Sequence, residues 1–241
     1  MQNPKGKFIY ARDLYNYMKH NPDKLKEEDS RMYQHIFEIF QHVADNSNIY
    51  ESYFYLGEMY LNGDYVLKNI EKAFRYFCVS ASYNHALSFY KLYTLLKEHK
   101  IRKSEAIYSP FDHSLTIKGQ YREDEKALLF KYLRRSAEEG YVEAQFELAN
   151  NLMSGDICKI DYKLALAWHR QACRNGYVLS YEPCGDLLYL GGSNLKKDKV
   201  LSLVMYYTAY SKGLFSLKDK VLKLRDELTK EGEPLPEMIL I

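Results

Sequence analysis

Several features that mark secreted, membrane-spanning or nucleic-acid-binding proteins are missing from this sequence. Its 241 residues include only four cysteines, unevenly spaced, unlike the disulfide framework of a small secreted domain. No run of about 18 apolar residues is present, so we expect no membrane insertion. With 34 basic and 32 acidic side chains the net charge is only +2, which gives no electrostatic case for nucleic acid as a partner.

Targeting signals are also missing from the first twenty residues. They contain no apolar stretch followed by small residues, so no secretory signal is expected. An early aspartate and little serine or arginine make a poor match to a mitochondrial transit peptide. Together with the few cysteines, this pattern predicts a reducing, cytoplasmic location.

Motifs for nucleotide binding and nucleophilic catalysis are absent too. The glycine pair in "YLGGSN", residues 189–194, lacks the Lys-Ser/Thr that completes a phosphate-binding loop. No serine lies in the nucleophile elbow typical of hydrolases. We therefore predict no enzyme activity, no cofactor and no small-molecule substrate.

What the sequence does contain is a repeated pattern with a period of about 36 residues. Each copy has a Leu-Gly-like pair, then a turn glycine, a helix-capping Asn or Asp, and a small residue in a second helical segment. The pairs are Leu56-Gly57, Leu148-Ala149 and Cys184-Gly185; the turn glycines are Gly63, Gly155 and Gly191. The caps are Asn69, Asp161 and Asp198, and the small residues are Ser80, Ser136, Ala172 and Ala209.

Each copy therefore reads as two amphipathic helices joined by a glycine-containing turn. A helical hairpin of this size cannot bury its own apolar face, so the copies must stack. Small residues at fixed positions let the helices approach closely, and aromatic residues fill the wider gaps. The pattern predicts an all-α chain of about ten or eleven helices in antiparallel pairs, with no multi-stranded sheet.

The order of these residues resembles the SEL-one-like repeat, a relative of the tetratricopeptide repeat. The pieces "KAFRYF", "SAEEGYVEAQFELA" and "LALAWHRQACRNG" carry the resemblance, which covers roughly residues 51–213. The second copy, "HALSFYKLYTLL", departs from it because it has no Leu-Gly pair and is followed by a long insertion. The resemblance implies a right-handed α-α superhelix, or solenoid, that serves as a scaffold or adaptor for other proteins. The alternative it implies is a regulatory or activator subunit of a membrane-associated enzyme or of an ER quality-control complex.

We predict a single helical-repeat domain over residues 1–241. Residues 1–50 read as a degenerate capping repeat, and residues 51–213 as the repeats, with an insertion at about 97–125. Residues 214–241 read as a capping helix and a tail. In the capping helix Leu217, Val221, Leu224 and Leu228 share one face, as expected of a helix that covers the end of a repeat array.

One cluster could be taken for a metal site. His169 and Cys173 are four residues apart, and Cys158 lies nearby in the sequence. Both His169 and Cys173 occupy positions that hold packing residues in the other copies, so we predict a buried imidazole beside a small thiol and no metal. Some bacterial members of the similar family bridge helices with disulfides. A Cys173–Cys184 bridge remains an alternative here, but no other copy has such a pair.

Two surfaces are candidates for binding a partner protein. In related tetratricopeptide arrays the first helix of each pair lines the concave face and contacts ligand. The resemblance transfers this role to Tyr55, Glu58, Lys91, Thr94, Glu147, Asn150 and Asp186. The second candidate is the insertion, where Pro110 blocks a helix and Ile107, Tyr108 and Phe111 are apolar residues that are costly to leave exposed.

Overall fold

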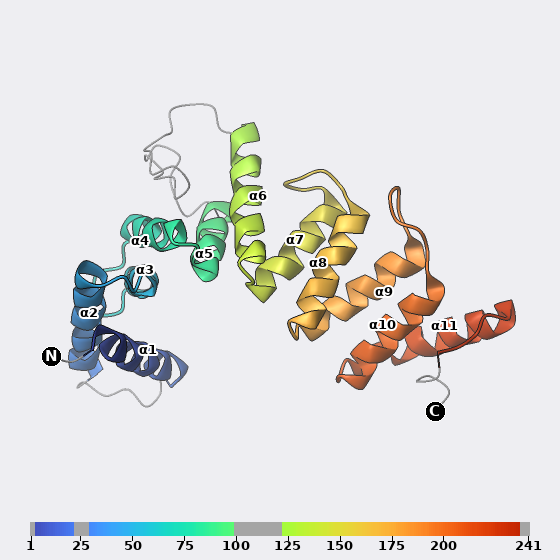
Figure 1. Cartoon of the computed structure of the whole chain (residues 1–241), viewed down its shortest axis with the longest axis horizontal. Helices are drawn as coiled ribbons and strands as arrows, with labels where there is room; N and C mark the ends of the chain where they lie inside the picture. Colours follow the sequence, from blue (N-terminus) through green and yellow to red (C-terminus); the bar gives the residue numbers. More distant parts are fainter. Residues whose placement is uncertain (1–2, 22–28, 99–121, 237–241) are drawn as a thin grey trace. The chain divides into compact units, whose positions relative to one another are not determined.

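The computed structural model describes residues 3–21, 29–98 and 122–236 (Figure 1). Over these residues the chain forms eleven α-helices and two short 3-10 helices. They contain no β-strand, only an isolated bridge between Gly192 and Leu195. The predicted all-α organisation in consecutive helix pairs is confirmed.

The helices fall into two compact units, residues 1–121 and 122–241. The first unit contains α1 (Pro4–His20), α2 (Asp29–Asn46), α3 (Glu51–Asn62), α4 (Ile70–Ser82) and α5 (Ala86–Lys97). The second contains α6 (Arg122–Glu138), α7 (Val142–Ser154), α8 (Tyr162–Arg174), α9 (Tyr181–Leu190), α10 (Lys199–Ser211) and α11 (Lys218–Glu231), with the 3-10 turns Val178–Ser180 and Phe215–Leu217. The second copy of the repeat is thus divided, with α5 in one unit and α6 in the other. That the whole chain is one domain stays a prediction.

The predicted helix caps are all present in the structure. The side chains of Asn69, Asp161 and Asp198 each accept a hydrogen bond from a backbone N–H of the first turn, at 2.9 Å in all three cases. These bonds satisfy donors that a helix start leaves unpaired. At the other end, Gly63 and Gly155 close α3 and α7 in the left-handed conformation, which glycine adopts without a steric penalty.

Close contact between paired helices explains the Leu-Gly pair. A Cβ atom added to Gly57 would lie 2.6 Å from the Phe77 ring, and one added to Gly185 would lie 2.4 Å from the Tyr206 ring. Each glycine therefore gives room to an aromatic ring on the second helix of its pair. In the copy between them the same two positions hold Ala149 and His169, a larger residue opposite a smaller ring.

The first helix pair covers the apolar face of α3. Side chains buried on α1 and α2 form one core cluster with Leu56 and Met59 of α3. The α3–α4 loop is tied to the same pair, because the Tyr15 hydroxyl donates to Asp64 at 2.7 Å and Lys19 forms an ion pair with Asp64 at 3.1 Å. Helices α1 and α2 therefore pack directly on α3, and the role of residues 1–50 as a capping repeat stays a prediction.

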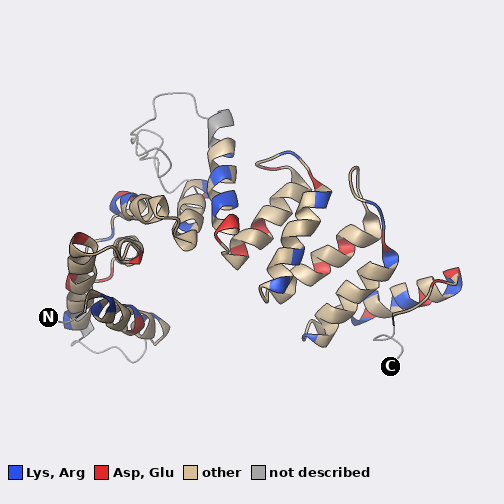
Figure 2. Ribbon diagram, viewed as in Figure 1, with Lys and Arg blue, Asp and Glu red and all other residues tan. Residues whose placement is uncertain are grey.

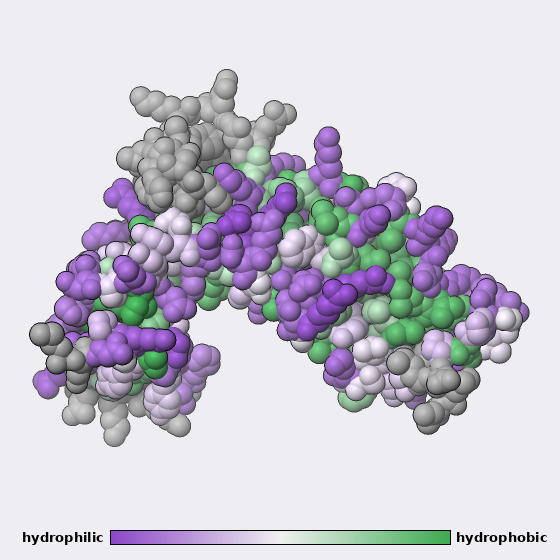
Figure 3. Space-filling view, in the orientation of Figure 1, coloured by the Kyte–Doolittle hydropathy of each residue, from purple (hydrophilic) through white to green (hydrophobic). Residues whose placement is uncertain are grey.

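The last helix closes the second unit. Its predicted apolar side chains are all buried: Leu217, Val221, Leu224 and Leu228. Gly232, with φ at +75°, ends α11 in the left-handed conformation. Apart from Leu222, which is exposed, the remaining positions of α11 hold polar residues. Both signs of charge are interspersed along the helices (Figure 2), and hydrophobic residues show between the charged ones on the surface (Figure 3).

Candidate partner-binding surfaces

The first-helix face of the first unit is held together by an ion pair. Glu58 on α3 and Lys91 on α5 approach to 2.9 Å between carboxylate oxygen and Nζ, and their side chains are 18% and 28% exposed. Thr94, also on α5, is half-buried and donates its hydroxyl to the Lys91 carbonyl at 3.0 Å. The structure thus brings three of the predicted residues to one face, where α3 and α5 are neighbours.

Tyr55 lies one helical turn before Glu58 but is engaged by the capping helices. Its ring stacks on Phe40 of α2 at a centroid distance of 4.9 Å and meets Phe8 and Tyr15 of α1 edge-on. Burial raises the pKa of its hydroxyl above the ordinary value. Most of this side chain is therefore used in packing the first unit, and a partner can reach only its half-exposed remainder.

The first-helix face of the second unit combines α7, α9 and α11. Glu147 and Asn150 lie half-buried on α7. Asp186 on α9 accepts a hydrogen bond from the Tyr206 hydroxyl at 2.6 Å and binds Lys220 of α11 at 3.0 Å. Lys220 also forms an ion pair with Glu182 at 2.8 Å, so this end of the face is a small charged network.

One arrangement recurs in both units. Glu58 and Asp186 occupy equivalent positions of the repeat, and Lys91 and Lys220 occupy the equivalent position on the next first helix. In each unit the acidic residue pairs with the lysine of the following first helix. Lys220 was not among the predicted residues. Glu147 follows Gly140 by seven residues, and Lys220 follows Gly213 by the same interval, so the register that selects Glu147 could also have found Lys220.

The other predicted interaction residues lie where no geometry is described. Ile107, Tyr108 and Phe111 fall within residues 99–121, outside the described residues. Helix α6 already begins at Arg122, so residues 122–125 belong to a helix rather than to the insertion. The role of the insertion therefore stays a prediction.

The residues considered as metal ligands serve in packing. His169 is fully buried, its Nδ1 lies 3.4 Å from the Ser180 hydroxyl, and its ring meets Phe146 edge-on. Burial lowers the pKa of His169 to about 4. All four cysteines are free thiols, and no group of three His, Cys, Asp or Glu side chains gathers within the described ranges.

Sequence comparison identifies the repeats. The model of the Sel1 repeat matches residues 51–85, 142–177 and 184–214, which are the helix pairs α3–α4, α7–α8 and α9–α10. The chain carries three Sel1 repeats. A search of curated proteins finds no match. Sel1 repeat proteins are typically protein–protein interaction scaffolds and are generally non-catalytic modules.

Solved structures with a similar fold include other Sel1 repeat proteins. A Sel1 repeat protein from Oxalobacter formigenes superposes with a TM-score of 0.61 at 19% identity, covering 95% of this chain and 88% of that one. The protective antigen c5321 of uropathogenic Escherichia coli has a TM-score of 0.43 at 20% identity, covering 88% and 49%. The immunity protein Pa5087 of Pseudomonas aeruginosa has a TM-score of 0.40 at 16% identity, covering 87% and 81%.

The Sel1 matches omit the second copy of the pattern, residues 86–141, in agreement with its missing Leu-Gly pair and its insertion. The first of these solved structures shares the helical-repeat fold. Among the described residues, no helix combines the length and the apolar character needed to cross a membrane.

Proposed function

We propose that this chain is a non-catalytic scaffold or adaptor subunit that binds a segment of a partner protein on the first-helix face. The Sel1 repeats support an interaction role in general. The observation that carries the proposal is that the first helices place the polar side chains of Glu58, Asn150 and Asp186 at one repeat position, and those of Lys91 and Glu147 at another.

The chemistry of this face suits an extended segment rather than a small molecule. Its acidic and basic groups are spread over successive first helices, each able to form one or two hydrogen bonds with a partner. Charged groups arranged in this way determine which partner is accepted more than they determine the overall affinity. The partner is expected to place charged side chains at intervals that match the first helices.

A charge reversal on α7 tests the proposed face. Glu147→Lys changes a half-buried carboxylate on a first helix, and Glu71→Lys makes the same change at an exposed position on the second helix α4. We expect Glu147→Lys to weaken partner binding about tenfold, equivalent to about 1.4 kcal/mol, and Glu71→Lys to leave it within twofold. Binding is measured by quantitative affinity purification of the full chain, followed by titration of the purified partner.

The outcomes separate the parts of the proposal. Equal loss in both variants would show a general effect of charge and would remove α7 from the interface. If the full chain retains no protein above a bead control, the scaffold proposal itself is wrong.

Replacing residues 103–120 by a short Gly-Ser linker tests the insertion in the same assay. A loss of binding with an unchanged circular dichroism spectrum is expected if Ile107, Tyr108 and Phe111 recognise the partner.

A further inference from the structure

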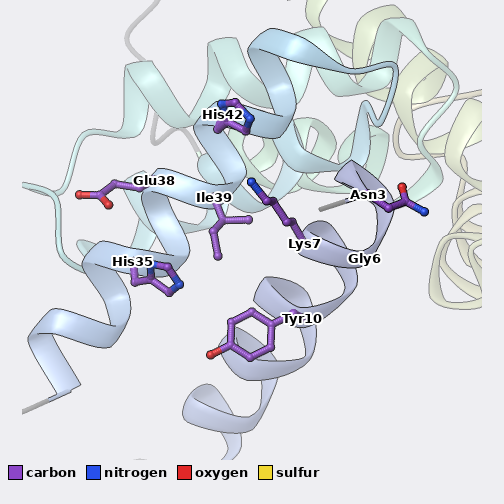
Figure 4. Close-up of a pocket in the computed structure, with 8 residues that line it drawn as sticks. All are labelled: Asn3, Gly6, Lys7, Tyr10, His35, Glu38, Ile39 and His42. Atoms are coloured by element: carbon purple, nitrogen blue, oxygen red, sulfur yellow. The ribbon is translucent and has the colours of Figure 1, made fainter. Parts of the chain in front are cut away.

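An open groove of about 660 Å³ lies between α1 and α2 in the first unit (Figure 4). Its volume is within the roughly 300–1,000 Å³ of small-ligand sites. Lys7 and Tyr10 line it from α1, and His35, Ile39 and His42 line it from α2. The groove is separate from the residues of the first-helix face, so its role does not depend on the function proposed above.

The polar groups of the groove include one ammonium, that of Lys7, and the imidazoles of His35 and His42. The Lys7 side chain extends across the groove toward Ile39 and His42 (Figure 4). The amide nitrogen of Asn46 lies 3.3 Å from Nδ1 of His42 and donates to the His42 carbonyl oxygen at 2.9 Å, so this amide lies beside the imidazole. The His42 imidazole, toward which Lys7 extends, can present a ring N–H to a ligand.

The single carboxylate of the groove does not neutralise this lysine. The Glu38 side chain points away from Lys7 (Figure 4), and its Oε1 accepts a hydrogen bond from Gln34 at 2.9 Å. No ion pair joins Lys7 to an acidic side chain in the described part of the chain. A negatively charged hydrogen-bond acceptor is therefore the group that would complement Lys7 in this groove.

Apolar surface lies beside these donors. Tyr10 is 54% exposed, its ring lies 6.4 Å from that of His35, and Ile39 is half-buried between the two helices. Gly6 adds further room on α1, since a Cβ atom at this position would meet nothing within 4 Å. The groove thus combines a cationic part at Lys7 with an aromatic and aliphatic part at Tyr10 and Ile39.

We propose that this groove binds an acidic segment of a partner protein, in which a carboxylate meets Lys7 and His42 and a neighbouring apolar side chain contacts Tyr10 and Ile39. The complementarity of charge decides the occupant, because a neutral or basic segment would leave the Lys7 ammonium without a counter-charge. The groove is a second interaction surface of the chain, formed by its capping helices.

The test is an NMR titration of the 15N-labelled full chain with the peptide Ac-Glu-Leu-Phe-Glu-NH2. Its neutral isostere Ac-Gln-Leu-Phe-Gln-NH2 and phenyl phosphate serve as separate arms. The acidic peptide is expected to shift the amide signals of Gly6, Lys7 and His42 and to bind at least fivefold more tightly than the isostere. Lys7→Gln should weaken it about three- to fivefold, the range of a single exposed ion pair.

Two further variants locate the site. Gly6→Leu fills the open space on α1 and should weaken binding at least tenfold while the melting temperature is unchanged or higher, because leucine is the better helix former. Lys68→Gln, which removes the same charge from the exposed α3–α4 loop, should bind as the wild type does. Equal binding of the two peptides, or an equal effect of Lys7→Gln and Lys68→Gln, would overturn the proposal. Binding of phenyl phosphate without the acidic peptide would overturn the assignment of a carboxylate.

Discussion

Substituting Gly185 by alanine tests the close packing of α9 on α10. The added Cβ would lie 2.4 Å from one carbon of the Tyr206 ring and 2.6 Å from the next, about 1 Å inside ordinary contact. The ring has little freedom to move, because Tyr206 is only 4% exposed and its hydroxyl donates to Asp186 at 2.6 Å. The Ser202 hydroxyl, which donates to the Gly185 carbonyl at 2.7 Å, holds the two helices at this spacing.

The expected cost follows from two opposing effects. Overpacking a well-filled site costs about 1–3 kcal/mol. Replacing glycine by alanine in a helix returns about 1 kcal/mol. Because the Tyr206 ring is buried and held by Asp186, the overpacking cost lies in the upper part of that range, about 2–3 kcal/mol. We therefore expect Gly185→Ala to lower the free energy of unfolding by about 1–2 kcal/mol, with a fall in melting temperature of about 2–4 °C per kcal/mol for a chain of this size.

The preceding repeat supplies the compensating change. There the equivalent positions hold Ala149 and His169, so Tyr206→His should make room for alanine at position 185. In the Tyr206→His background, Gly185→Ala is expected to be neutral or stabilising by up to about 1 kcal/mol. The double-mutant cycle should therefore show a coupling of about 2 kcal/mol, well above the roughly 0.5 kcal/mol scatter of independent sites.

The assay is urea unfolding followed by circular dichroism at 222 nm, with Gly6→Ala as the matched control. A Cβ at Gly6 meets nothing, so that substitution should stabilise the chain by its helix propensity alone. If Gly185→Ala stabilises the chain as much as Gly6→Ala does, the steric reasoning is refuted. An additive cycle would refute the size complementarity between the two positions.

Three further predictions concern charges and thiols. Glu58→Gln removes the half-buried ion pair with Lys91. The substitution should lower the free energy of unfolding, measured by thermal unfolding, by about 1 kcal/mol at low salt and by less in 1 M NaCl. An effect independent of salt would contradict this prediction. Burial lowers the pKa of His169 to about 4, whereas an imidazole in the unfolded chain has a pKa near 6.5. Between these two pH values the unfolded state binds one more proton than the folded state. The free energy of unfolding therefore falls as the pH drops from about 6.5 to 4. His169→Phe should remove one proton from this dependence, worth up to about 3 kcal/mol, and an unchanged slope of unfolding free energy against pH would show that the imidazole is not buried neutral. Burial raises the pKa of the Cys78 thiol, whereas a hydrogen bond with Cys184 lowers the pKa of the Cys173 thiol. Iodoacetamide should therefore label Cys173 before Cys78, as followed by mass spectrometry. The reverse order of labelling would contradict this prediction.

The features predicted correctly from the sequence are those that depend on one residue in one local conformation. Asn69 and Asp161 cap helices because a short side chain at that position reaches the free N–H groups of the first turn. Gly63 ends α3 because the backbone there has φ of +83°, which disfavours other residues. Such signals require no knowledge of which helix lies beside which.

The features that were missed depend on packing between elements. Tyr55 is engaged by α1 and α2, and nothing in its own repeat indicates how the capping helices lie across it. The lysine partner of Asp186 is 34 residues away, so the pair is visible only once the spacing of first helices is known. The early start of α6 was missed because "REDE", residues 122–125, has no apolar periodicity, although acidic residues are favourable in a first turn.

The bonds between the α3–α4 loop and the capping helices bear on where the chain can be divided. The first matched repeat begins at residue 51, which makes that position an obvious place to cut. A chain shortened there would lose both partners of Asp64, and it would expose Leu56 and Met59 to water. It would also lose the Phe37 ring that contacts Tyr65, a bulky residue held at φ of +67° in the same loop. The compact unit that contains the first matched repeat is thus longer than the repeat itself, because it includes α1 and α2.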